Sequence, residues 1–103
     1  MSYEIQVLAD RLSIVTPENT EYGIRWREIH RVHAYRLDGG KTSYRVLCFD
    51  FANGGYIEVN DSMPGFDRML ALLGAHVPLP SDYQQQVNAT KCHEPPLTLY
   101  CRT

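Results

Sequence analysis

The fold is decided by residues 44–60, which read YRVLCFDFANGGYIEVN. Two strand-like segments flank Asn53-Gly54-Gly55, and a tight hairpin turn needs residues that adopt positive φ at low cost. The pattern therefore predicts two antiparallel strands, at about 44–51 and 56–60. The first of them carries apolar residues on both faces, which predicts a central position in the sheet.

The chain before this hairpin predicts further strands. Apolar and aromatic residues alternate with polar ones over 3–9, a turn follows at Asp10-Arg11, and β-branched residues continue over 12–16. A short strand is expected at 22–25, a turn at 26–29 and a longer strand from about 30 to 37. An alternation of period two is typical of strands that bury one face, so an antiparallel sheet is expected to begin with a hairpin.

The segment after residue 60 predicts a helix. Its apolar residues have the i, i+3, i+4, i+7 spacing of one helix face: Phe66, Met69, Leu70 and Leu73. Asp61 or Ser62 is the expected N-cap, Pro64 belongs to the first turn and Gly74 ends the helix. A helix with a single apolar face is expected to dock on the sheet.

Beyond Val77, prolines interrupt regular structure. A short helical turn is expected over 83–87, with Ser81-Asp82 as its cap, and an edge strand is expected at 97–101. The predicted fold is α+β, with an antiparallel and strongly curved sheet, a half barrel, and one amphipathic helix packed on it. A single domain over 1–103 is expected, with a core at 3–74 and a C-terminal extension at 75–103. The sequence leaves open whether this extension pairs with the same sheet or with another chain.

Composition places the chain among ordinary globular proteins. It has 103 residues, of which 44% are apolar and 21% charged, and a formal net charge of -2. No segment approaches the roughly 20 apolar residues of a membrane span, and the N-terminus lacks the pattern of a secretory signal. Three cysteines without CxxC spacing suit reduced thiols. These features predict a cytoplasmic protein without a transmembrane segment, and they leave its oligomeric state open.

The sequence does not predict catalysis or a metal site. Cys48 lies in the middle of an apolar strand, where an inert buried thiol is expected. His30 and His33 are an odd number of residues apart, so on one strand they point to opposite faces. There is no GxSxG, GxGxxG or P-loop motif. No catalytic residue, cofactor or metal is therefore expected. An enzyme remains the third hypothesis, and it requires a pocket that gathers His30 or His33 with Glu28 and Cys48.

Two surfaces are candidates for binding. The first is acidic with two aromatic anchors, and it is the predicted site for a protein partner: Asp50, Tyr56, Glu58, Asp61, Phe66 and Asp67. The second is a basic sheet face for anionic lipid or phosphate-containing ligands: Arg25, Arg27, Arg31, Arg36 and Arg45. The acidic balance of the whole chain argues against nucleic acid.

A family resemblance favours the first surface. Residues 24–32 have the form Ile-x-Trp-x-x-Ile-x-x-Val, and the helix contains Phe66-x-x-Met69-Leu70. This arrangement resembles bacterial pleckstrin-homology-like domains, and residues 46–73 are similar to small bacterial proteins, some of them suspected toxin immunity proteins. The likeness covers about 3–74 and supplies no catalytic residue. It implies a curved sheet closed by a helix, and an immunity protein that neutralises a cognate toxin by direct binding.

Overall fold

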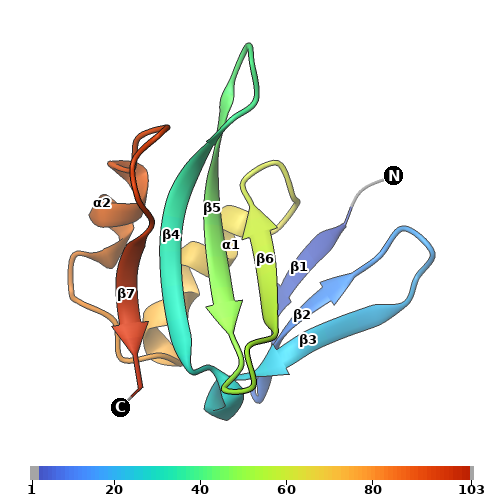
Figure 1. Cartoon of the computed structure of the whole chain (residues 1–103). Helices are drawn as coiled ribbons and strands as arrows, with labels where there is room; N and C mark the ends of the chain where they lie inside the picture. The colour runs from blue at the N-terminus through green and yellow to red at the C-terminus, as the bar shows by residue number, and fades with distance from the viewer. Residues whose placement is uncertain (1–2, 103) are drawn as a thin grey trace.

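The computed structural model describes residues 3–102 and has an α+β fold, as predicted (Figure 1). The elements are, in chain order, β1 (Glu4–Val7), β2 (Arg11–Val15), β3 (Glu21–Arg25), β4 (Arg31–Asp38), β5 (Ser43–Asp50), β6 (Tyr56–Asn60), α1 (Phe66–Leu72), α2 (Tyr83–Asn88) and β7 (Leu97–Cys101). Short 3₁₀ turns follow β3 at Trp26–Glu28 and α1 at Leu73–Ala75. Neither α-helix in the described part of the chain is long and apolar enough to cross a membrane.

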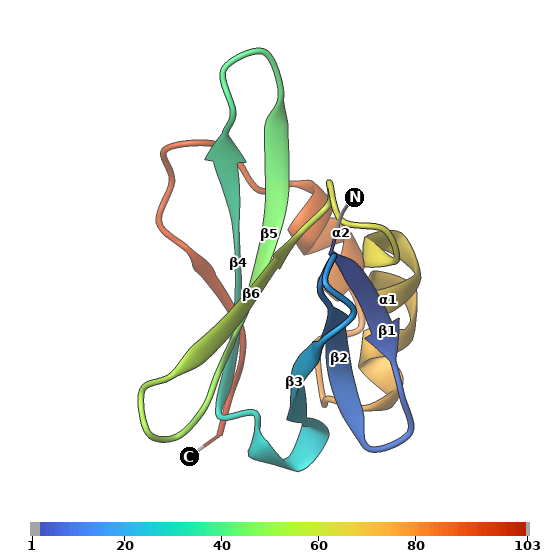
Figure 2. The same cartoon turned by 90° about the vertical axis from the view of Figure 1, so that its right-hand side faces the viewer.

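The strands form two antiparallel sheets. One contains β1-β2-β3, and the other has the order β6-β5-β4-β7. The three-stranded sheet and both helices lie on the same side of the four-stranded sheet, so none of these elements covers its other side (Figure 2). The predicted half barrel is therefore built from two sheets that do not close on each other.

The hairpin at 44–60 forms as predicted. β5 pairs with β6 in a register that places Phe49 opposite Ile57, and Gly54 adopts a φ of 94° in the connecting turn. β5 lies between β6 and β4, which confirms its central position. The C-terminal extension also belongs to this sheet, because β7 pairs antiparallel with β4, with a register shift between Val32 and His33.

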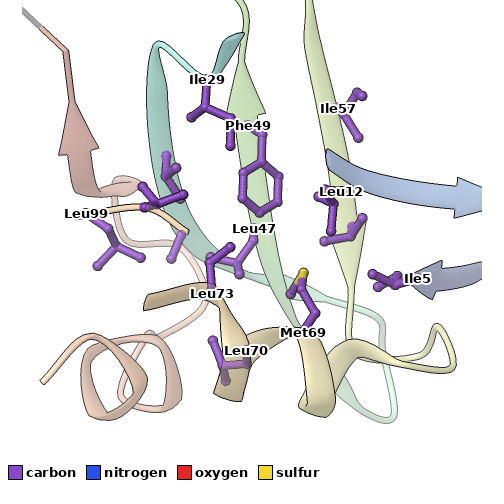
Figure 3. Packing of buried hydrophobic residues seen from close by; sticks show 14 of the residues in the cluster. Ile5, Leu12, Ile29, Leu47, Phe49, Ile57, Met69, Leu70, Leu73 and Leu99 are labelled. Carbon is purple, nitrogen blue, oxygen red and sulfur yellow. The ribbon is translucent and has the colours of Figure 1, made fainter. Parts of the chain in front are cut away.

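The core fills the space between the four-stranded sheet, the three-stranded sheet and α1 (Figure 3). Leu12 of β2, Leu47 and Phe49 of β5 and Met69 of α1 are fully buried. Phe66 also belongs to this cluster, with only 2% of its surface exposed. The predicted apolar face of the helix is thus confirmed, because all four of its residues are buried: Phe66, Met69, Leu70 and Leu73.

The predicted start of the helix is wrong. α1 begins after Gly65, which is its N-cap and has a φ of 91°, rather than at Asp61 or Ser62. The side chain of Asn60 accepts a bond from the Ser62 amide at 2.9 Å, and Asp61 binds Arg45, so both residues belong to a turn before the helix. The predicted end is also different, since α1 passes at Leu72 into a 3₁₀ turn and Gly74 lies inside that turn.

Candidate functional site

The side of the four-stranded sheet that faces away from both helices, here called the outer face, carries a group of closely spaced reactive side chains. Strand alternation places every second residue on it, and register places them in rows across β4, β5 and β6. One row is Arg31, Asp50 and Tyr56, and the next is His33, Cys48 and Glu58. In Figure 1 this face of the sheet is turned toward the viewer, with α1 and α2 behind it.

The outer face is hollowed. An open depression of about 570 Å³ lies over β4, β5 and β6 and reaches the end of β7. Both rows line it, together with neighbouring residues from the hairpin turn and the flanking segments: His30, Tyr35, Phe51, Ala52, Gly54, Pro96 and Cys101. The hollow therefore combines aromatic, thiol, imidazole and charged groups on a rigid sheet.

Asp50 organises the hollow. Arg31 donates from Nε to Asp50 Oδ2 at 2.8 Å, while His33 Nε2 and Cys48 Sγ lie 3.2 and 3.4 Å from Asp50 Oδ1. Burial alone would raise the pKa of Asp50, but the bonds from Arg31, His33 and Cys48 outweigh burial and hold that pKa below its usual range. Asp50 is therefore an ionised acceptor at the centre of a connected network.

Cys48 is buried as expected, with 7% of its surface exposed, but it does not belong to the main core. Alternation along β5 turns Leu47 and Phe49 to the core and Cys48 to the hollow. Burial raises the pKa of the Cys48 thiol to about 12, and the hydrogen bond and charge of Asp50 act in the same direction. A thiol with this pKa is protonated at neutral pH, so it is a poor nucleophile.

This environment predicts slow alkylation of Cys48. Iodoacetamide at pH 8 is expected to modify exposed Cys101 at least about tenfold faster than Cys48, because only a thiolate reacts. Mass spectrometry of peptides sampled over time measures both rates in one reaction. Modification of Cys48 before Cys101 would show that the thiol is activated, and would contradict the environment described here.

A second pair stands beside this network. The Tyr35 hydroxyl donates to Glu58 Oε2, and burial, this bond and the charge of Glu58 raise the pKa of Tyr35 above its usual value. Tyr56, at the edge of the hollow on β6, has 65% of its surface exposed. The face thus presents the exposed side chain of Tyr56 beside side chains that already bind each other.

The structure divides the predicted partner-binding set. Asp50, Tyr56 and Glu58 line the hollow together. Asp61 and Asp67 do not, since each accepts a bond at 2.9 Å from Arg45, which points to the α1 side of the sheet and lies over the Phe66 ring. The prediction that Phe66 contacts a partner is wrong, because Phe66 packs in the core and only 2% of its surface is exposed.

The predicted basic face is divided as well. Arg31 lies on the outer face and pairs with Asp50, whereas Arg36 and Arg45 oppose each other in register on the other side. Arg36 donates to the carbonyl oxygens of Thr90 and Asn88 at 2.6 and 3.0 Å, which ties β4 to the end of α2. Arg25 and Arg27 are exposed near the 3₁₀ turn after β3. Strand alternation and these contacts prevent the five arginines from forming one surface.

Comparison with known proteins gives no match. No family model, curated protein or solved structure matches this chain.

The sequence did not predict that His33, Cys48 and Asp50 lie close together. One nitrogen, sulfur or oxygen atom from each of these side chains lies within 4.8 Å of the other two. The signal was available, because pairing the strands at 30–37 and 44–51 across their short loop places His33 opposite Cys48. His30 also lines the hollow, but Glu28, which the enzyme hypothesis requires, is not among its lining residues. Glu28 instead accepts a bond from the Arg25 amide at 3.0 Å.

Proposed function

We propose that this chain is a non-catalytic protein-binding module that docks its partner on the outer face of the four-stranded sheet. The observation that carries the proposal is an exposed aromatic side chain, Tyr56, beside a hollow in which several polar side chains are already bonded to one another. Tyrosine is enriched among the residues that dominate interface energies. Groups held in place before binding lose little conformational freedom when the partner arrives, which favours affinity.

The charge of the face favours a partner with basic groups. Arg31 and Asp50 neutralise each other, and Glu58 is exposed. Among residues 3–102, no arginine or lysine forms an ion pair with Glu58. A lysine or arginine of the partner placed against Glu58 would complete the pairing and orient the complex.

The specific role that we propose is that of an immunity protein, which neutralises a bacterial toxin by covering its working surface. This step rests on the resemblance of residues 46–73 to suspected immunity proteins, together with the exposed acidic side chain on the proposed docking face. Toxins that act on nucleic acid or anionic substrates carry basic surfaces. Such a surface is complementary to Glu58 and its surroundings.

The test begins with purification of the tagged chain from the organism that makes it, followed by reconstitution of the binary complex. Tyr56→Ala is expected to weaken the complex by about 30-fold or more, as for an interface anchor. Tyr22→Ala is the matched control, because Tyr22 is 44% exposed on the three-stranded sheet. Recovery of no protein partner from cells rich in the chain, or equal affinity of the two variants, would refute the proposal.

The immunity role has a separate test. Expression of the partner alone is expected to stop growth of the host cell, and co-expression of the chain is expected to restore it. Tyr56→Ala should restore growth less well than Tyr22→Ala at equal protein levels. A partner that binds the chain but does not stop growth would contradict the immunity role, while the protein-binding function would still hold.

A further inference from the structure

Three potential metal ligands meet in the hollow. His33 and Cys48 are direct cross-strand partners on β4 and β5, and Asp50 stands two residues beyond Cys48 on the same face. His33 Nε2, Cys48 Sγ and one carboxylate oxygen of Asp50 lie within 4.8 Å of one another. All three side chains are largely protected from solvent, with exposed fractions of 20% for the His33 side chain, 7% for Cys48 and 14% for the Asp50 side chain.

The spacing of these atoms is close to that of ligands around one ion. Tetrahedral Zn²⁺ with bonds of about 2.0 Å to oxygen and nitrogen and about 2.3 Å to sulfur separates nitrogen from oxygen by about 3.3 Å, and sulfur from oxygen by about 3.5 Å. The distances to Asp50 Oδ1 are 3.2 Å from His33 Nε2 and 3.4 Å from Cys48 Sγ. The third pair, the His33 nitrogen and Cys48 Sγ, lies within 4.8 Å and would be about 3.5 Å apart around Zn²⁺, so these two side chains must move toward each other for all three atoms to contact one ion.

We propose that His33, Cys48 and Asp50 bind a divalent transition-metal ion, and that Zn²⁺ is the ion that suits them best. Imidazole nitrogen, thiolate sulfur and carboxylate oxygen are the three ligand types that proteins use for zinc. On binding, the Cys48 S–H bond breaks and its proton leaves to solvent, the His33 ring carries its proton on Nδ1 instead of Nε2, and Sγ–metal and Nε2–metal bonds form. The thiolate and the carboxylate each carry a negative charge that offsets the charge of the ion, although the carboxylate also pairs with Arg31.

The surroundings support the ligands. Arg31 binds Asp50 Oδ2 at 2.8 Å, so the carboxylate is oriented with Oδ1 toward His33 and Cys48. Such outer contacts fix ligand geometry and strengthen metal binding. Because the three ligands line the open hollow, a fourth ligand, either water or a side chain of a partner, reaches the ion from solvent. A metal ion in the hollow differs from the expectation of no metal drawn from the sequence, and its binding does not require the proposed docking function.

The test uses the full-length chain, freed of metal with a chelator and reduced. Titration with Co²⁺ is expected to produce thiolate-to-metal charge-transfer absorption that saturates at one ion per chain, and Zn²⁺ is expected to displace it. Cys48→Ala and His33→Gln should each abolish the absorption, and Arg31→Gln should weaken binding about 10- to 100-fold. Cys101→Ala is the matched control and should bind like the wild type, since Cys101 lies outside the group of three.

Thermal unfolding gives a second readout that also checks the fold of each variant. Zn²⁺ at about 100 times its Kd is expected to raise the Tm of the wild type by about 10 °C and to leave that of Cys48→Ala unchanged. If Cys48→Ala fails to fold, His33→Gln takes its place. Absence of charge-transfer absorption in the wild type, or its persistence in the folded Cys48→Ala or His33→Gln variant, would overturn the proposal.

Discussion

Phe49→Ala is expected to lower the free energy of unfolding by about 3–5 kcal/mol. Phe49 is fully buried in the central strand β5 and points from that strand into the cluster shared with β2 and α1 (Figure 3). Removal of the ring gives up the free energy of transferring it from water to the core, and it leaves a cavity. The surrounding strands and helix are held by their other contacts and cannot move in to fill that cavity. Urea denaturation followed by circular dichroism measures the loss.

Tyr56→Ala is the control for this prediction, because Tyr56 is an aromatic residue on the neighbouring strand whose side chain is largely exposed. Its replacement is expected to change the free energy of unfolding by less than about 1 kcal/mol. Since a domain of this kind has about 5–15 kcal/mol of total stability, the two variants separate clearly. Equal losses would mean that the core does not lie on the α1 side of the four-stranded sheet.

Gly65→Ala is expected to cost at least about 3 kcal/mol, a large effect for the addition of one methyl group. Gly65 has a φ of 91° at the start of α1, and a Cβ built on it would lie 2.2 Å from the carbonyl oxygen of Ile5. That oxygen belongs to the backbone of β1, which is held there by the bond from the Ile5 amide to Pro64 O at 2.8 Å. The methyl group can be accommodated only if β1 and α1 move apart.

Gly40→Ala separates the two parts of this cost. Gly40 has nearly the same φ, 90°, but a Cβ there would meet nothing within 4 Å. Its replacement is expected to cost only about 1 kcal/mol, which is the backbone penalty alone. Chemical denaturation of both variants gives the difference. A Gly65→Ala variant no less stable than Gly40→Ala would show that β1 does not pack against the start of α1.

Features set by neighbouring residues were predictable from the sequence. The hairpin follows from Asn53-Gly54-Gly55 between two strand patterns, and the buried face of α1 follows from apolar spacing. The start of α1 was not predictable in this way, because Asp61 has a favourable residue type for a cap but is engaged by Arg45 from β5. The bond between Arg45 and Asp61, which are distant in sequence, thus prevents Asp61 from capping the helix as its residue type would favour. The pairing of β7 with β4 depends in the same way on contacts far apart in sequence.

The site was only partly predictable for a related reason. Asp50, Tyr56 and Glu58 could be placed near one another from a single hairpin, and they do lie together. Asp61 and Phe66 follow closely in sequence, but the turn into α1 carries them to the other side of the sheet. Cys48 was predicted to be a buried thiol, but apolar residues occupy both faces of the strand around it. The side to which its thiol points therefore depends on the positions of the second sheet and of α1, which the sequence does not give.

Site-specific photo-crosslinking tests most directly whether the outer face is the docking surface. A photoreactive amino acid is placed at position 56 or at position 22, and each chain is irradiated in the organism that makes it. We predict a crosslink to one abundant protein from position 56 and none to that protein from position 22. Equal crosslinking from both positions, or crosslinking from position 22 alone, would contradict docking on the outer face.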